Sequence, residues 1–119
     1  MAEARQILTP ADVDAVIEAS RKRPVLVFKH STRCPISAAA HREWSAFLAG
    51  PEAERADHFW VRVIQERPVS LALASRVGVP HQSPQVLLIR DGRAVWHASH
   101  YAITAGRLKA ALDQAAAQR

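Results

Sequence analysis

The sequence predicts an α/β protein in which a mixed central sheet of four or five strands is flanked by helices on both faces. Short apolar runs of strand character alternate with segments whose apolar residues recur at helical spacing. The dipeptide Asp91-Gly92 joins the last two apolar runs as a tight hairpin, and a helical segment closes the chain. Alternation of this kind builds crossover units, which place helices on the two faces of a sheet.

The first quarter of the chain is predicted to form an edge strand, a helix and a central strand. Residues 7–8 are the candidate edge strand. Thr9 is the N-cap of the following helix, which directs an apolar stripe inward, made of Val13, Val16 and Ile17. Pro24 prevents continuation of this helix. The apolar run 25–28 is then typical of a strand buried on both faces.

The rest of the chain continues the same alternation. A helix is expected to extend to about Leu48, with apolar positions at Ile36, Ala40, Trp44 and Phe47. Residues 51–58 are expected to be a polar connection, and 59–64 a strand rich in β-branched and aromatic residues. Pro68 opens a short helix that Gly78 ends. Strands at 86–89 and 94–97 follow, and Thr104 caps the last helix.

The only cysteine of the chain, Cys34, lies between the central strand and the next helix. Pro35 suits the first helical position, so Cys34 is expected to be the N-cap, beside unpaired backbone amides and the positive end of the helix dipole. We expect these amides, the Arg33 charge and the Ser37 hydroxyl to support a nucleophilic thiolate. The alternative is a buried, inert cysteine that packs as a small hydrophobic residue.

Composition narrows the class of protein. The 119 residues suffice for one domain, spanning 1–119, and 49% hydrophobic with 23% charged residues is typical of a soluble globular chain. Apolar runs stay well short of the roughly 20 residues that span a bilayer, and the amino terminus lacks a signal-peptide pattern. We therefore expect a cytoplasmic protein without a membrane partner.

Charge and cysteine usage exclude further classes. The net charge of +5 comes from arginines scattered along the chain, so a solvated basic surface is favoured over a nucleic-acid site. A single cysteine allows no internal disulfide and no zinc-ribbon spacing, and we expect no metal. If Cys34 performs redox chemistry, the second sulfur must come from another molecule.

Several uncommon motifs occur in an order that resembles a known family. These are the strand-loop-Cys-x-x-Ser-helix unit at 28–37, the segments 66–70, 81–85 and 96–100, the Asp-Gly hairpin and the closing helix. Together they resemble the thioredoxin fold and, more specifically, the monothiol bacilliredoxins of the bacillithiol system, over about residues 5–115. On composition alone Pro84 is an ordinary trans loop proline. The resemblance instead places it at the cis-proline position of this fold.

The resemblance also implies an activity. Members of this family reduce mixed disulfides between protein cysteines and bacillithiol, a thiol built from glucosamine, malate and cysteine. Cys34 is then the attacking thiol, supported by Arg33, Pro35 and Ser37, and Ser37 stands where a dithiol relative carries its resolving cysteine. Substrate is expected to contact the loop before Cys34 at Thr32 and to pair with the backbone at Ser83 and Pro84.

The implied partners are S-thiolated proteins, a low-molecular-weight thiol as co-substrate in place of a bound cofactor, and a reductase system. The implied setting is redox homeostasis and the oxidative stress response. Arg33 and Lys29 are candidates for attracting the malate carboxylates.

Three other functions remain open at this stage. Cys-x-x-Ser proteins also carry iron–sulfur clusters between subunits, although Pro35-Ile36 replaces the Gly-Phe of that motif. A non-catalytic, stress-linked binding protein is the second alternative. Cys34 with His30 or His81 would resemble a protease dyad, but no Asn or Asp is evidently placed to orient the histidine. His97 and His100 are interpreted as strand-end and interface residues.

Overall fold

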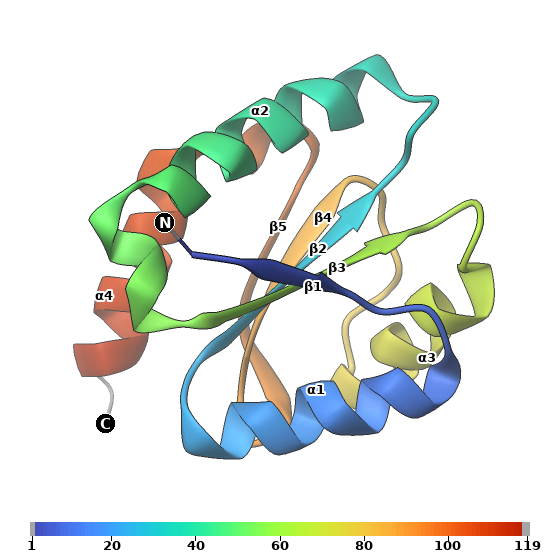
Figure 1. The fold of residues 1–119 in the computed structure, drawn as a ribbon, viewed down its shortest axis with the longest axis horizontal. Helices are drawn as coiled ribbons and strands as arrows, with labels where there is room; N and C mark the ends of the chain where they lie inside the picture. The colour runs from blue at the N-terminus through green and yellow to red at the C-terminus, as the bar shows by residue number, and fades with distance from the viewer. Residues whose placement is uncertain (1, 118–119) are drawn as a thin grey trace.

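A five-stranded mixed sheet lies between two pairs of helices in the computed structural model, which describes residues 2–117 (Figure 1). The elements in chain order are β1 (Ala4–Gln6), α1 (Pro10–Lys22), β2 (Val25–His30), α2 (Pro35–Ala49), the 3₁₀ turn η1 (Pro51–Arg55), β3 (Asp57–Arg62), α3 (Arg67–Val77), β4 (Gln85–Arg90), β5 (Arg93–Ser99), the 3₁₀ turn η2 (His100–Ala102) and α4 (Ala105–Ala117). Within 2–117, no helix combines the length and apolar character needed to cross a membrane.

The strand order is β1-β3-β2-β4-β5, which makes β2 the central strand. It pairs in parallel with β3 and antiparallel with β4. At the carboxyl end of β2, Lys29 lies between Val61 of β3 and Gln85 of β4. The predicted fold class, a mixed sheet with helices on both faces, is confirmed.

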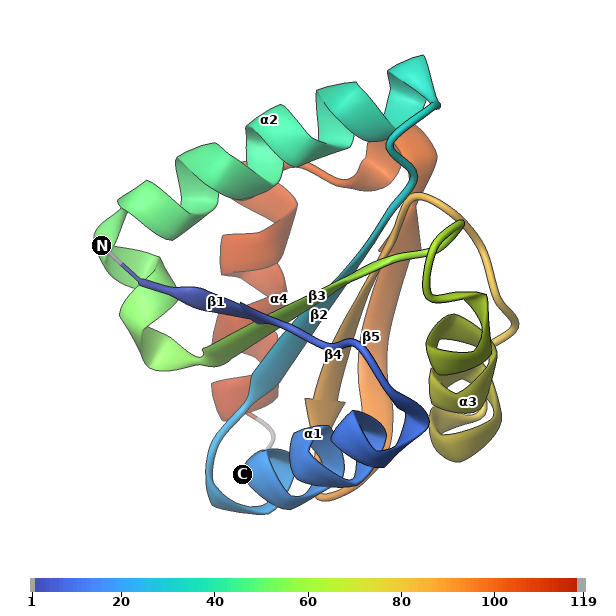
Figure 2. The same ribbon diagram turned by 45° about the vertical axis from the view of Figure 1, so that its right-hand side comes forward.

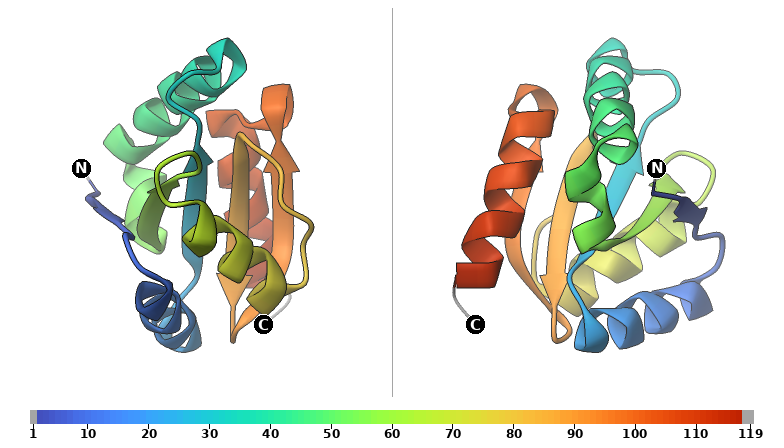
Figure 3. Two further views of the ribbon diagram at one scale, coloured as in Figure 1. Left: turned by 90° about the vertical axis from the view of Figure 1, so that its right-hand side faces the viewer. Right: turned by 60° about the vertical axis from the view of Figure 1, so that its left-hand side comes forward.

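Each face of the sheet carries its own core, because successive strand residues point to opposite sides. Val25 and Val27 of β2 pack with Leu87 and Ile89 of β4 beneath α1 and α3. The alternate residues of the same strands, which include Leu26, Phe28, Val86 and Leu88, form the second core together with residues of α2 and α4. These two helices cover the other face of the sheet (Figure 3). All eight side chains have no exposed surface, so β2 and β4 are buried on both faces.

The observed boundaries differ from the prediction at the edge strand β1, in the segment 51–58 and at the start of β3. The edge strand is Ala4–Gln6 and not 7–8, although the Ile7 amide still donates to the Trp60 carbonyl at 2.9 Å. Ile7 is buried in the core below, which explains its apolar character without a strand. The expected polar connection contains the 3₁₀ turn Pro51–Arg55, and β3 begins two residues earlier than predicted.

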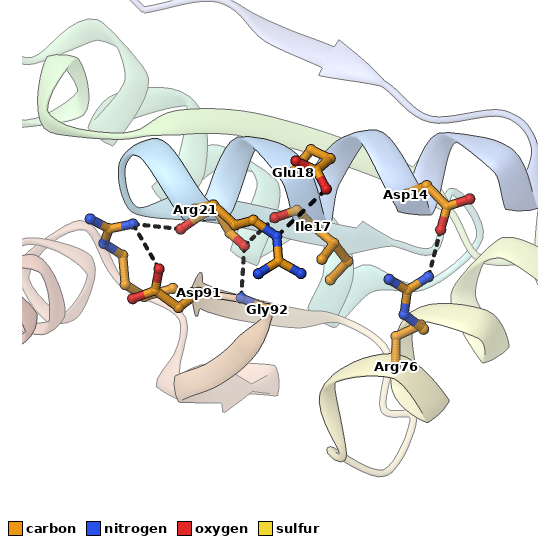
Figure 4. A network of polar contacts seen from close by, with 9 residues as sticks. Asp14, Ile17, Glu18, Arg21, Arg76, Asp91 and Gly92 are labelled. Carbon is orange, nitrogen blue, oxygen red and sulfur yellow. Dashed lines mark hydrogen bonds and ion pairs between the residues drawn. The ribbon is translucent and has the colours of Figure 1, made fainter.

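The β4–β5 hairpin is tied to the end of α1 through Ser20. Asp91 and Gly92 have φ values of 54° and 79°, as a two-residue type I′ turn requires. The amide of Gly92 donates to Ser20 Oγ and the amide of Asp91 to the Ser20 carbonyl, both at 2.9 Å. The Ser20 hydroxyl in turn donates to the Ile17 carbonyl at 2.6 Å. Figure 4 shows this network beside the Arg76–Asp14 ion pair, which joins α3 to α1.

Replacing Ser20 with alanine should destabilise the fold without changing its topology. The variant loses two hydrogen bonds at a buried position and leaves the Gly92 amide without its acceptor, a loss of about 1–3 kcal/mol. Urea unfolding measures the change. Ser75→Ala on the exposed side of α3 is the matched control and should stay within about 0.5 kcal/mol of wild type. An equal effect of the two substitutions would contradict a role for Ser20 in holding the hairpin.

Candidate active site

Cys34 is the N-cap of α2, and Pro35 is the first helical residue, both as predicted. The Cys34 backbone is extended, with φ −109° and ψ 122°, and its carbonyl accepts the Ala38 amide at 3.0 Å. The side chain is half-buried and makes no cap hydrogen bond within the described residues. Its sulfur is therefore a free thiol at the positive end of the α2 dipole.

Ser37 is placed differently from the prediction. Its side chain has no exposed surface, and its hydroxyl lies 2.7 Å from His30 Nδ1 and accepts the Ser31 amide at 2.9 Å. Neither of these hydrogen bonds goes to Cys34, so the expected direct support of the thiolate is replaced by an indirect one. Ser37 holds the 30–34 loop against the first turn of α2 and thereby positions Cys34.

His30, which is hydrogen-bonded to Ser37, also belongs to a cluster of stacked aromatic rings. Its ring lies 5.5 Å from that of Phe28 and 4.9 Å from that of His41, and Trp44 packs on Phe28 at 4.8 Å. Burial, together with the neighbouring His41, lowers the pKa of His30. A neutral His30 can form the hydrogen bond to the Ser37 hydroxyl in either tautomer, as acceptor or as donor at Nδ1, so the bond persists at neutral pH.

The segment Ser83–Pro84 lies at the start of β4, at the same end of the sheet as the beginning of α2 (Figure 2). The peptide bond between the two residues is cis. Pro84 is buried, and its carbonyl accepts the amide of His100 at 3.0 Å. His100, the first residue of η2, has φ 58°, which is uncommon for a residue with a side chain. Its hydrogen bond to the Pro84 carbonyl connects η2 to the start of β4.

The remaining predicted site residues lie at the surface around Cys34. Thr32, Arg33 and Pro35 are exposed. Thr32 Oγ1 is 3.5 Å from Gln65 Nε2, which follows β3, so the loop before Cys34 approaches the loop after that strand. Arg33 directly precedes Cys34 in the chain, and its side chain is exposed to solvent.

Lys29 is not available to substrate in this way. Its side chain has no exposed surface, and its Nζ lies 3.1 Å from His81 Nδ1. Burial lowers the pKa of Lys29 to about 8. Burial also lowers the pKa of His81, as do the charges of Lys29 and Arg67. The neutral imidazole of His81 is thus the acceptor for a buried ammonium group.

Two of these placements carried a signal in the sequence. Lys29 continues the inward alternation of Val25 and Val27, which predicts a buried side chain. Ser37 stands three residues before Ala40 and seven before Trp44, on the buried stripe of α2, whereas Ile36 is only half-buried. The partners His30 and His81 carried no local signal, because their contacts depend on how the loops close over the sheet.

A free cysteine at a helix N-terminus, at the end of a mixed sheet where an antiparallel strand begins, defines a protein of the thioredoxin fold with one free thiol. Residues 5–108 match the family described as Monothiol bacilliredoxin BrxC. The chain belongs to this family, and the predicted resemblance is confirmed.

Solved structures agree with this class. A protein described as a proposed oxidoreductase with a thioredoxin fold is 33% identical, with a TM-score of 0.79 over 91% of this chain and 92% of that one. Thioredoxin of Malassezia sympodialis is 15% identical, with a TM-score of 0.74 over 96% and 91% of the two chains. Thioredoxin of Fasciola hepatica is 18% identical, with a TM-score of 0.72 over 92% and 97%. The two thioredoxins show the shared fold, and the family supports a thiol redox role.

Lys29 predicts an unusual pH dependence of stability. Below about pH 8 it is charged in both the folded and unfolded states, and the full cost of burying the charge is present. Between about pH 8 and 10.5 the folded state releases the proton first, so the unfolded state binds more protons and stability rises with pH. The whole rise is at most about 3 kcal/mol.

Urea unfolding of wild type and Lys29→Met across this pH range measures the effect. The wild type should gain stability relative to Lys29→Met as pH rises, and the variant should be as stable as wild type or more stable near neutral pH. Lys22→Met, at the exposed end of α1, controls for the loss of a lysine. A wild-type-to-variant difference that is constant with pH would exclude a buried, titrating ammonium at Lys29.

Proposed function

We propose that this chain is a monothiol thiol–disulfide oxidoreductase that uses Cys34 to reduce mixed disulfides between protein cysteines and bacillithiol. The observation that carries the proposal is a half-buried free thiol at the N-terminus of α2, anchored through the loop contacts of Ser37, in a chain with no second cysteine. Membership of the bacilliredoxin family supports the choice of bacillithiol as the small thiol.

In the first step, the Cys34 thiolate attacks the bacillithiol sulfur of the protein mixed disulfide. A new disulfide forms between Cys34 and bacillithiol, and the protein sulfur leaves as a thiolate that takes a proton from water. The dipole of α2 and the nearby Arg33 favour the negative charge on Cys34 before the attack. The backbone at Ser83 and the exposed Thr32 contact the substrate on either side of the sulfur.

In the second step, the thiolate of another small thiol attacks the bacillithiol sulfur bound to Cys34. The products are a small-molecule disulfide and the free Cys34 thiolate, so each turnover consumes one external thiol, and the bacillithiol of the substrate supplies the other sulfur of the product disulfide. A reductase system then restores the small thiol. Such an enzyme serves redox homeostasis in the cytoplasm during oxidative stress, with S-thiolated proteins as its partners.

Separate substitutions of Cys34 and Ser37 distinguish the role of the nucleophile from that of the residue that holds its loop. Cys34→Ser should abolish release of the protein thiol, because a hydroxyl does not replace a thiolate near neutral pH. Ser37→Ala should keep most of the activity and lose about 1–3 kcal/mol of stability, since His30 and the Ser31 amide lose their partner. The assay follows a protein with one bacillithiol mixed disulfide by mass. The mechanism is wrong if Cys34→Ser stays active or if folded Ser37→Ala is equally inactive.

A cysteine at position 37 should change the way in which Cys34 is cleared. Ser37→Cys places two sulfurs within the first turn of α2, so the variant should form an internal disulfide after its first turnover. It should then depend on a dithiol reductant and no longer on a second small thiol. Quantifying the internal disulfide by mass spectrometry after one turnover, with each reductant supplied in turn, tests this. Accumulation of the Cys34–bacillithiol adduct alone would contradict it.

A further inference from the structure

A cavity of about 370 Å³ lies beside the Ser83–Pro84 segment, between the loop that precedes β4 and the edge strand β5. Its polar lining comes from five residues: Gln82, Gln85, His97, Ser99 and His100. Two of them connect it to the candidate active site. Gln85 directly follows Pro84 in the chain, and the amide of His100 donates to the Pro84 carbonyl at 3.0 Å. The volume falls within the range of small-ligand pockets.

Two buried side-chain oxygens on either side of Pro84 lack a partner. Within residues 2–117, neither Ser83 Oγ nor Gln85 Oε1 has a hydrogen-bond partner. Gln85 is only 1% exposed, and its Nε2 already donates to the Pro80 carbonyl at 3.2 Å. A buried acceptor left unpaired is costly, and the large majority of buried side-chain polar atoms in proteins have a hydrogen-bond partner. An occupant that satisfies Gln85 Oε1 must bring a hydrogen-bond donor.

The surroundings favour negative charge on the same occupant. None of the described residues that line the cavity is acidic. Lys29 is buried opposite Gln85 in the β2–β4 register and on the same face of the sheet, although it does not itself line the cavity. His81, whose Nδ1 contacts the Lys29 ammonium, stands in the chain between Pro80 and Gln82, which both line the cavity.

We propose that this cavity binds the malyl-glucosaminyl part of bacillithiol, whose sugar hydroxyls donate to Gln85 Oε1 and whose carboxylates lie toward His97 and His100. This inference rests on the proposed function and adds the subsite that selects the small thiol. Cavity residues recognise a hydroxylated dicarboxylate, while the cysteinyl part of the same ligand reaches Ser83 and Cys34. Peptide thiols such as glutathione have amide donors for Gln85, but they carry their two carboxylates at opposite ends of the molecule. They cannot direct both carboxylates toward His97 and His100 as malate can, so the subsite disfavours them.

The test uses glucosaminyl malate, which contains the proposed recognition group and no thiol. Titration into the ¹⁵N-labelled wild-type chain should give saturable amide shifts concentrated at residues 79–85 and 97–100. His97→Glu adds a negative charge at the cavity and should weaken binding by about tenfold or more. Val95→Glu adds the same charge to an exposed position on the same strand outside the cavity, and its affinity should stay within roughly twofold of wild type.

Two further measurements test which groups of the cavity and of the ligand are recognised. His100→Gly removes the imidazole while keeping a residue that accepts φ 58°, and it should also weaken binding. S-methylglutathione, a peptide ligand without sugar hydroxyls, should bind about tenfold more weakly than glucosaminyl malate. Shifts located elsewhere, equal binding of the two ligands, or an equal loss in His97→Glu and Val95→Glu would overturn the proposal.

The outcome is separable from that of the proposed function. A wild-type chain that reduces bacillithiol mixed disulfides but gives no saturable shifts with millimolar glucosaminyl malate would overturn the subsite alone. A chain that binds the probe at this cavity but fails to release the protein thiol would overturn the proposed reaction and leave the subsite in place.

Discussion

The antiparallel register between β2 and β4 is the constraint on which the site depends. Lys29 lies opposite Gln85, so the residues that follow β2 and the residues that precede β4 must meet at one end of the sheet. Cys34 and Pro84 belong to these two segments, and neither strand can slip by one residue without moving its buried side chains to the wrong face. The two apolar cores therefore fix the positions of the segments that carry Cys34 and Pro84.

Most of the fold was predictable because its strands are unusually apolar. Strands β2 and β4 are buried on both faces, so they consist mainly of continuous apolar runs. Such runs are easily distinguished from loops in the sequence. Helix starts were equally clear, since Thr9, Pro35 and Thr104 are typical N-terminal residues. Edge strand β1 was misplaced, because three residues paired on one side leave little pattern in a sequence.

The candidate site was predictable only in its chain-local part. Cys34 as N-cap and Pro35 as first helical residue follow from adjacent residue types. The partner of the Ser37 hydroxyl could not be predicted in this way, because a serine at an inward helical position is compatible with any nearby donor or acceptor. His30 and His81 reach their partners across loops, and their contacts arise from tertiary packing that no short window of sequence contains.

The anchoring of Ser37 bears on how this lineage can evolve. A dithiol enzyme needs a cysteine at position 37, yet that serine is also the residue that fastens the active-site loop to His30 and Ser31. One codon change would thus add a function and remove a structural support together. A second sulfur at this position therefore carries a cost in stability, and a descendant that holds the loop by other contacts would not bear that cost.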